Sequence, residues 1–176
     1  MATHTVVIET PRGSAEKFAF DPEHQAFALK RVLPVGMVFP FDFGFVAGTK
    51  ADDGDPVDVV VLSEFKSFPG CLVECRILGA LLGQQQEKTA NKEKTGNKNG
   101  KNKRARRMIR NDRLIAVPAA AHTMDHVKNI DDLPGAMLEE LEQFFVNYHE
   151  QEGTKYESLE RVSAARAEKL LAQHET

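Results

Sequence analysis

Hydrophobic residues alternate along much of the first two thirds of this 176-residue chain, and this period of two constrains the fold most. Between residues 57 and 62, Val57, Val59 and Val61 would share one face of a strand, with Val60 and Leu62 on the other. Further strands are predicted at residues 4–9, 71–82 and 113–118, with a hairpin formed by 17–20 and 26–29. Short strands at this spacing favour a β-barrel or a β-sandwich.

The period becomes helical toward the C-terminus. After Asp131 and Asp132, which could cap a helix, apolar residues recur at helical spacing. These are Met137, Leu138, Leu141, Phe144, Phe145 and Tyr148. A last helix is predicted from Ser158 to about His174. Strands followed by helices predict an α+β, mainly β domain in which C-terminal helices pack on a small barrel.

The length fits a single domain covering residues 1–176. No apolar run reaches the roughly 20 residues of a membrane span, and "MATHTVVIET" lacks the features of a signal peptide, so a cytoplasmic location without membrane contact is expected. Cys71 and Cys75 would lie about 13 Å apart along one strand. A disulfide needs Cα atoms within about 7 Å, so two thiols in a reducing compartment are predicted.

The formal net charge of −3 hides one strongly basic segment. Residues 88–110 hold ten basic residues and one acid, Glu93, which gives a local charge of +9. The surrounding stretch, residues 83–111, is rich in Lys, Asn, Gln and Gly and lacks hydrophobic periodicity. Such a composition buries too little apolar area to offset its ordering entropy, so a disordered basic loop between strands is predicted.

The stretch "DDGDPVDVVVL", residues 52–62, places four aspartates directly before or at the start of a predicted strand. A solvated acidic turn is one interpretation, and a site for Mg²⁺, which prefers oxygen ligands, is another. An EF-hand loop counted from Asp53 requires glycine at the sixth position, where this chain has Asp58, so that interpretation fails.

Four phenylalanines alternate with other residues just before this turn. Phe39, Phe41, Phe43 and Phe45 would lie on one face of an extended segment. They would form either a wall of the hydrophobic core or the lining of a site.

Several segments together resemble the soluble family I inorganic pyrophosphatases. "DGDPVDV", residues 53–59, resembles the signature of that family. "VVIETPRG" resembles its opening strand, "FPFDFGFV" its aromatic stretch, and "MDHVKNIDDLP" with "EQFFVNYHE" its late loop and helix. The resemblance runs from about Val6 to Tyr148, apart from the basic loop. It implies a five-stranded barrel of the oligonucleotide-binding (OB) type with helices packed outside, and a homo-oligomer.

The resemblance also implies a reaction, the hydrolysis of pyrophosphate to two phosphates with Mg²⁺ as cofactor. Asp55 would be the general base on the attacking water, and Glu9 falls on an active-site glutamate. The implied metal ligands are Asp53, Asp55 and Asp58, with Asp112 as a further candidate. The implied phosphate-binding residues are Lys17, Arg31, Arg113 and Tyr148.

The sequence departs from the family pattern at residues that touch this chemistry. Phe43 stands where the family has tyrosine, and His149 and Arg113 stand where it has lysine. One metal-binding aspartate position reads Asn111, with Asp112 beside it, and a second, more distant aspartate is missing.

Three interpretations therefore follow from the sequence. The chain is a working Mg²⁺-dependent pyrophosphatase, or a catalytically silent relative that binds phosphate compounds. Alternatively, residues 88–110 act as a nucleic-acid-binding arm on the barrel. No aromatic residue occurs from Gly83 to Asn111, so this arm would lack the stacking groups of single-strand readers.

Overall fold

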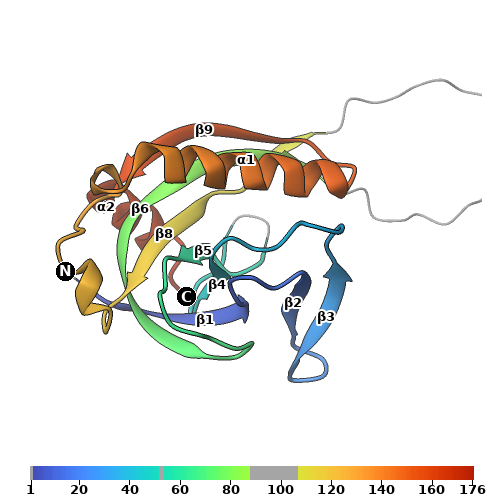
Figure 1. Cartoon of the computed structure of the whole chain (residues 1–176), viewed down its shortest axis with the longest axis horizontal. Helices are drawn as coiled ribbons and strands as arrows, with labels where there is room; N and C mark the ends of the chain where they lie inside the picture. Colours follow the sequence, from blue (N-terminus) through green and yellow to red (C-terminus); the bar gives the residue numbers. More distant parts are fainter. Residues whose placement is uncertain (1, 52–53, 88–106) are drawn as a thin grey trace, which may run out of the picture.

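The computed structural model describes residues 2–51, 54–87 and 107–176 (Figure 1). Strands dominate, and two α-helices lie in the C-terminal third. In chain order the elements are β1 (His4–Thr10), β2 (Glu16–Asp21), β3 (Ala26–Val32), β4 (Asp42–Val46), β5 (Asp58–Val61), β6 (Leu72–Gln86), β7 (Met108–Arg110), β8 (Arg113–Pro118), the 3₁₀ turns η1 (His122–Met124) and η2 (Ile130–Asp132), α1 (Gly135–Gln151), β9 (Tyr156–Ser163) and α2 (Ala164–Ala172).

Five strands close into a ring. The hydrogen-bonded order is β1-β4-β5-β8-β6, and β6 pairs back to β1, with Val73 opposite Val6. The β5–β8 pair is parallel and the other four pairs of the ring are antiparallel. A closed ring satisfies every strand edge, which confirms the predicted five-stranded OB-like barrel. The β2–β3 hairpin, also predicted, forms a separate two-stranded sheet.

The period of two is confirmed by the cores. Val57, Val59 and Val61 belong to a buried cluster that includes Ala167 and Leu171 of α2. Their neighbours in sequence, among them Val60 and Leu62, belong to a second buried cluster that packs against α1. Each face of the β5 segment therefore meets a different helix.

The prediction of a final helix from Ser158 is wrong in its first part. Residues 156–163 form β9, which pairs antiparallel with the second half of β6, and only Ala164–Ala172 are helical. Strand β6 has 15 residues and extends beyond the ring, so an edge remains for β9 to pair with (Figure 1). Tertiary pairing therefore overrides local helix preference here.

The prediction of a structureless loop over residues 83–111 is wrong at both of its ends. Strand β6 continues to Gln86, and β7 pairs with it, with Arg110 opposite Gln84. Residues 83–86 and 108–110 thus belong to the sheet, because each finds a backbone partner across the ladder. The rest of the predicted basic loop, residues 88–106, lies outside the described residues.

Asp131 and Asp132 do not cap α1. Asn129 and Asp132 form a capping box around η2, in which the carboxylate of Asp132 accepts from the backbone N–H groups of Lys128 and Asn129. These bonds lower the pKa of Asp132. In the described structure α1 begins after Pro134 without a side-chain cap.

The cysteines and the helices bear on the predictions about thiols and membrane spans. Cys71 and Cys75 are both free thiols, as predicted. In the described part of the chain, no helix is both long and apolar enough to cross a membrane.

The packing of β4 against β1 gives the first prediction. A Cβ atom on Gly44 would lie 2.0 Å from the carbonyl oxygen of Val7, a backbone atom that cannot swing aside. We expect Gly44→Ala to lower the free energy of unfolding by about 3 kcal/mol, measured by urea denaturation. Gly135→Ala is the matched control. A Cβ atom added at Gly135 would have no heavy atom of another part of the described structure within 4 Å. Gly135→Ala should leave stability unchanged or raise it by up to about 1 kcal/mol. Equal losses in both variants would contradict this account.

Candidate active site

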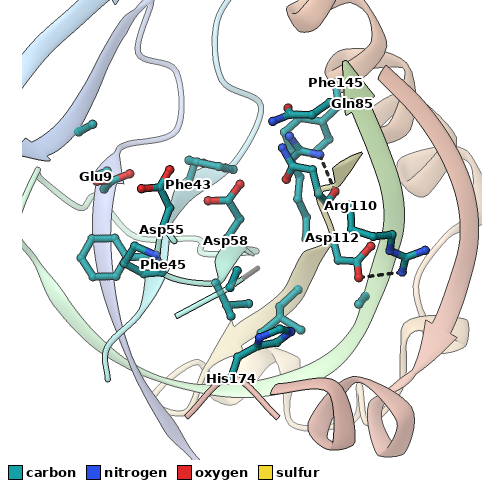
Figure 2. A pocket seen from close by; sticks show the side chains of 18 of the residues that line it. Glu9, Phe43, Phe45, Asp55, Asp58, Gln85, Arg110, Asp112, Phe145 and His174 are labelled. Atoms are coloured by element: carbon teal, nitrogen blue, oxygen red, sulfur yellow. Dashed lines mark hydrogen bonds and ion pairs between the residues drawn. The ribbon is translucent and has the colours of Figure 1, made fainter. Parts of the chain in front are cut away.

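A large cavity of about 900 Å³ opens between the barrel and α1. Figure 2 shows the side chains of Glu9, Asp55 and Asp58 facing one space from one side, with Asp112 and Arg110 on the opposite side. Strand β1 contributes Glu9, and the two aspartates come from the turn before β5 and its first residue. The cavity therefore has an acidic wall, which we define as Glu9, Asp55 and Asp58.

The turn that carries Asp55 is held by backbone bonds. Ala51 N–H donates to the carbonyl of Asp55 at 2.7 Å, and Gly54 N–H donates to the carbonyl of Ala51 at 2.9 Å. Gly54 has φ of 92°, a left-handed conformation that glycine adopts without strain. Beyond the turn, the buried hydroxyl of Thr49 accepts from the N–H of Val57. These bonds fix where the acidic wall projects.

The acidic wall concentrates negative charge in a partly buried place. Burial is the main cause that raises the pKa of Glu9, and the charges of Asp58 and Asp55 add to the effect. The N–H of Phe20, which donates to Glu9 at 2.8 Å, and the nearby Lys17 act in the opposite direction. A cation placed among these carboxylates would relieve this repulsion, so the donor set fits a divalent metal ion.

Among the described residues, no group of three His, Cys, Asp or Glu side chains is gathered closely enough to hold a metal ion alone. Asp53, the remaining predicted ligand, lies outside those residues.

Asp112 lines the cavity on the other side, but its carboxylate is already engaged. One oxygen accepts from the backbone N–H of Gly83 at 3.0 Å, and the other pairs with Arg110 at 2.8 Å. Arg110 would have to move for a metal ion to take its place. A metal-binding role for Asp112 stays a prediction.

Arg113, at the start of β8, is a buried cation that lines the same cavity, and the parallel register that pairs Val59 with Leu114 places it beside Asp58. Only 3% of its surface is exposed, and its guanidinium lies 4.1 Å from the ring centre of Phe145 and 4.6 Å from that of Tyr156. Its nitrogens contact the carbonyl of Asn111 and the ring of His149. Within the described chain its Nε has no hydrogen-bond partner, and no carboxylate forms an ion pair with it. A buried guanidinium without a carboxylate favours an anionic ligand.

Two other predicted phosphate-binding residues, Lys17 and Arg31, lie against a third, Tyr148 of α1. Lys17 lies 5.2 Å from the centre of its ring, and the Arg31 guanidinium lies 4.2 Å from it. Among described atoms the buried hydroxyl of Tyr148 has no hydrogen-bond partner. Lys17 and Tyr148 line the cavity. Arg31 does not, but it forms an ion pair at 3.2 Å with Glu152, which does.

The alternating phenylalanines serve both of the roles considered from sequence. Phe39 and Phe43 are buried in the cluster against α1, and Phe41 packs against that cluster. Phe39, Phe43 and Phe45 also line the cavity. The segment is therefore a core wall and a site lining together, although only Asp42–Val46 form a regular strand.

Comparison with known proteins identifies the family of this chain. A family model described as "Inorganic pyrophosphatase" matches residues 6–175, nearly the whole chain. The chain belongs to the inorganic pyrophosphatase family. The predicted resemblance is thus confirmed, and that family hydrolyses pyrophosphate to phosphate with a divalent metal cofactor.

Individual relatives agree with the family model. The inorganic pyrophosphatase of Thermus thermophilus is 37% identical over 150 residues, which cover 85% of this chain and 74% of the relative. That of Leifsonia xyli is 34% identical and covers 97% of this chain and 93% of the relative. A crystal structure of the inorganic pyrophosphatase from Thermus thermophilus superposes with a TM-score of 0.80 at 30% identity, covering 96% of this chain and 86% of that one. These similarities support a hydrolase that acts on pyrophosphate.

Sequence reasoning missed Glu152, which pairs with Arg31 and lines the cavity. It lies just past α1, and its one sequence signal is its position three residues after His149. It likewise missed that His149 contacts Arg113, since 36 residues separate them in sequence.

The raised pKa of Glu9 gives the second prediction. Because the folded state holds this proton more tightly than the unfolded state, ionising Glu9 opposes folding at neutral pH. Glu9→Gln, which can still accept from Phe20, should therefore raise the metal-free stability at neutral pH by up to about 1 kcal/mol. The gain should vanish below pH 4.5, the ordinary pKa, where both states are protonated.

Urea denaturation in the presence of a chelator measures this difference. Glu140→Gln, on an exposed position of α1, is the control and should change little at either pH. A loss of stability in Glu9→Gln at neutral pH would rule out the burial of an unfavourable charge.

Proposed function

We propose that this chain hydrolyses pyrophosphate to two phosphates with Mg²⁺ as its metal. The observation that carries this proposal is that carboxylates and a buried cation line one cavity. The acidic wall suits a hard cation, and the buried guanidinium of Arg113 suits a phosphate oxygen. A phosphoanhydride with a bound metal ion offers a positive charge to the carboxylates and negative oxygens to Arg113.

The acidic wall would supply the metal ligands and the base. Asp55 and Asp58, together with Asp53, would hold Mg²⁺, and Glu9 would add negative charge beside them. Bound Mg²⁺ lowers the pKa of coordinated water and neutralises the charge of the phosphate oxygens. Asp55 would accept the proton of the attacking water.

Cationic and hydroxyl side chains in and beside the cavity would hold the substrate. Arg113 would donate N–H groups to a phosphate oxygen. The hydroxyl of Tyr148, which has no hydrogen-bond partner among the described residues, would donate to another. Lys17, which lies over the rings of Phe43 and Tyr148, and Arg31 would supply further positive charge. These cations replace the water that the anion loses on entering the cavity.

We further infer one domain over residues 1–176, a homo-oligomer and a cytoplasmic location. The match of the family model to residues 6–175 supports the single domain. Large exposed apolar side chains on the surface, among them Leu29, Val32, Phe68 and Leu72, support association between copies. The two free thiols suit a reducing compartment.

The third prediction tests the reaction. Purified protein should release phosphate from pyrophosphate only when Mg²⁺ is added, and a chelator should stop the release. Asp55→Asn should lower kcat by about 10²–10⁴-fold, the usual contribution of a positioned base. Asp125→Asn is the matched control, because Asp125 pairs only with exposed His122 in the described structure. It should retain full turnover.

Two results would contradict the proposal. Absence of turnover at saturating Mg²⁺ would favour the silent phosphate-binding relative. Full turnover by Asp55→Asn would assign the base to another residue.

A further inference from the structure

His149 is a buried histidine that the proposed reaction does not use. It is 3% exposed, and its Nε2 lies 3.0 Å from Nη2 of Arg113. A guanidinium can only donate hydrogen bonds, so Nε2 must be the acceptor. The imidazole is therefore neutral, with its proton on Nδ1.

A second contact gives the same tautomer independently. Nδ1 of His149 lies 3.3 Å from the hydroxyl of Thr154, and that hydroxyl donates to the carbonyl of His149 at 3.1 Å. A hydroxyl has a single proton to donate, so it must accept from Nδ1. The ring is fixed in orientation as well, since it stacks on Tyr156 at 5.1 Å with an angle of 12° between the planes.

Glu152 extends this contact to the other arginine. One carboxylate oxygen lies 3.7 Å from Nδ1 of His149, and the other lies 3.2 Å from the guanidinium of Arg31. A continuous chain of polar contacts thus runs from Arg31 through Glu152 and His149 to Arg113. The carboxylate favours a proton on Nδ1, which keeps Nε2 an acceptor.

We propose that neutral His149 is a positioning residue that holds the Arg113 guanidinium in the orientation that receives phosphate, with Glu152 fixing its tautomer. The inference rests on the proposed function, in which Arg113 binds phosphate. Among the described residues, the ionisable groups that face His149 include Arg113 from β8, Tyr148 from α1, Glu152 beyond α1 and Tyr156 from β9, with Arg31 behind Glu152.

The affinity for phosphate should depend on the protonation of His149. Protonation would place an N–H on Nε2, against the N–H of Arg113, and would set two positive charges side by side. The hydrogen bond would be lost and Arg113 displaced, so phosphate binding should weaken as the pH falls. A histidine that served simply as a cation for phosphate would do the opposite and strengthen binding.

The fourth prediction is measured by titrating the full chain with inorganic phosphate in a calorimeter over a range of pH. His149→Gln offers an acceptor oxygen that does not titrate. It should bind phosphate within about twofold of wild type at neutral pH and bind it more tightly than wild type at acid pH. His149→Leu removes the acceptor and should weaken binding about tenfold at neutral pH, the scale of one hydrogen bond to a charged group. His122→Gln, at an exposed histidine, is the control and should match wild type throughout.

The comparison separates this role from simpler ones. All variants meet the same phosphate, so the titration of the ligand itself cancels. Wild type that binds more tightly than His149→Gln at acid pH would overturn the proposal, as would equal losses in the Gln and Leu variants. If His149→Leu fails to fold, the pH profile of His149→Gln decides alone.

Turnover of pyrophosphate, measured in parallel, distinguishes the two proposals. His149→Leu should raise KM about tenfold and leave kcat nearly unchanged, because Arg113 binds the substrate without reacting. If wild type shows no turnover, the proposed reaction fails, while the calorimetric comparison still tests the role of His149.

Discussion

Backbone hydrogen bonds along β6 hold the barrel and the cavity in one frame, because this strand pairs with four others. Its first residues pair with β1 and close the ring, and its middle pairs with β8. Its second half pairs with β9, and its last three residues pair with β7. Glu9 is carried by β1, Arg113 by β8, and the Tyr156 ring that covers Arg113 by β9. The spacing between Glu9 and the buried cation thus depends on the register of β6, and a slip in that register would separate these two groups.

The cavity keeps charges of both signs in unfavourable surroundings. Burial and neighbouring carboxylates raise the pKa of Glu9, and in the same cavity Arg113 is nearly fully buried without an ion pair to a carboxylate in the described chain. Stacking against Phe145 and Tyr156 offsets part of the desolvation of the guanidinium. A ligand that presents a metal cation to the carboxylates and an anionic oxygen to Arg113 would offset the remaining cost of burying these charges. Buried charges of both signs in one cavity are typical of functional sites, which trade stability for binding.

The sequence predicted those parts of the fold whose local pattern agrees with their tertiary setting. Alternation in residues 57–62 assigned each valine to the correct face, because each face of β5 is buried against a different cluster. It failed for β9, where the pattern of "YESLERVS" is ambiguous and the deciding partner, the far half of β6, lies more than 70 residues away. The site also divides into residues with a local sequence signal and contacts without one. Lys17, Arg113 and Tyr148 were predicted from motifs, and they line the cavity. The contact of His149 with Arg113 depends on how α1 packs near β8, so it has no local signal.

The pairing of Arg113 with His149 also bears on the departures from the family pattern, in which both positions are lysine. Two ammonium groups at hydrogen-bonding distance would repel each other in a buried place unless an anion lay between them. Arginine with neutral histidine leaves a single positive charge there, and the histidine takes one guanidinium N–H while others remain for a ligand. The substrate would therefore meet fewer fixed cations but a better oriented one. More of its negative charge would have to be neutralised from the acidic wall, through the metal held there, so the demand for metal ion should be greater than in a relative with both lysines.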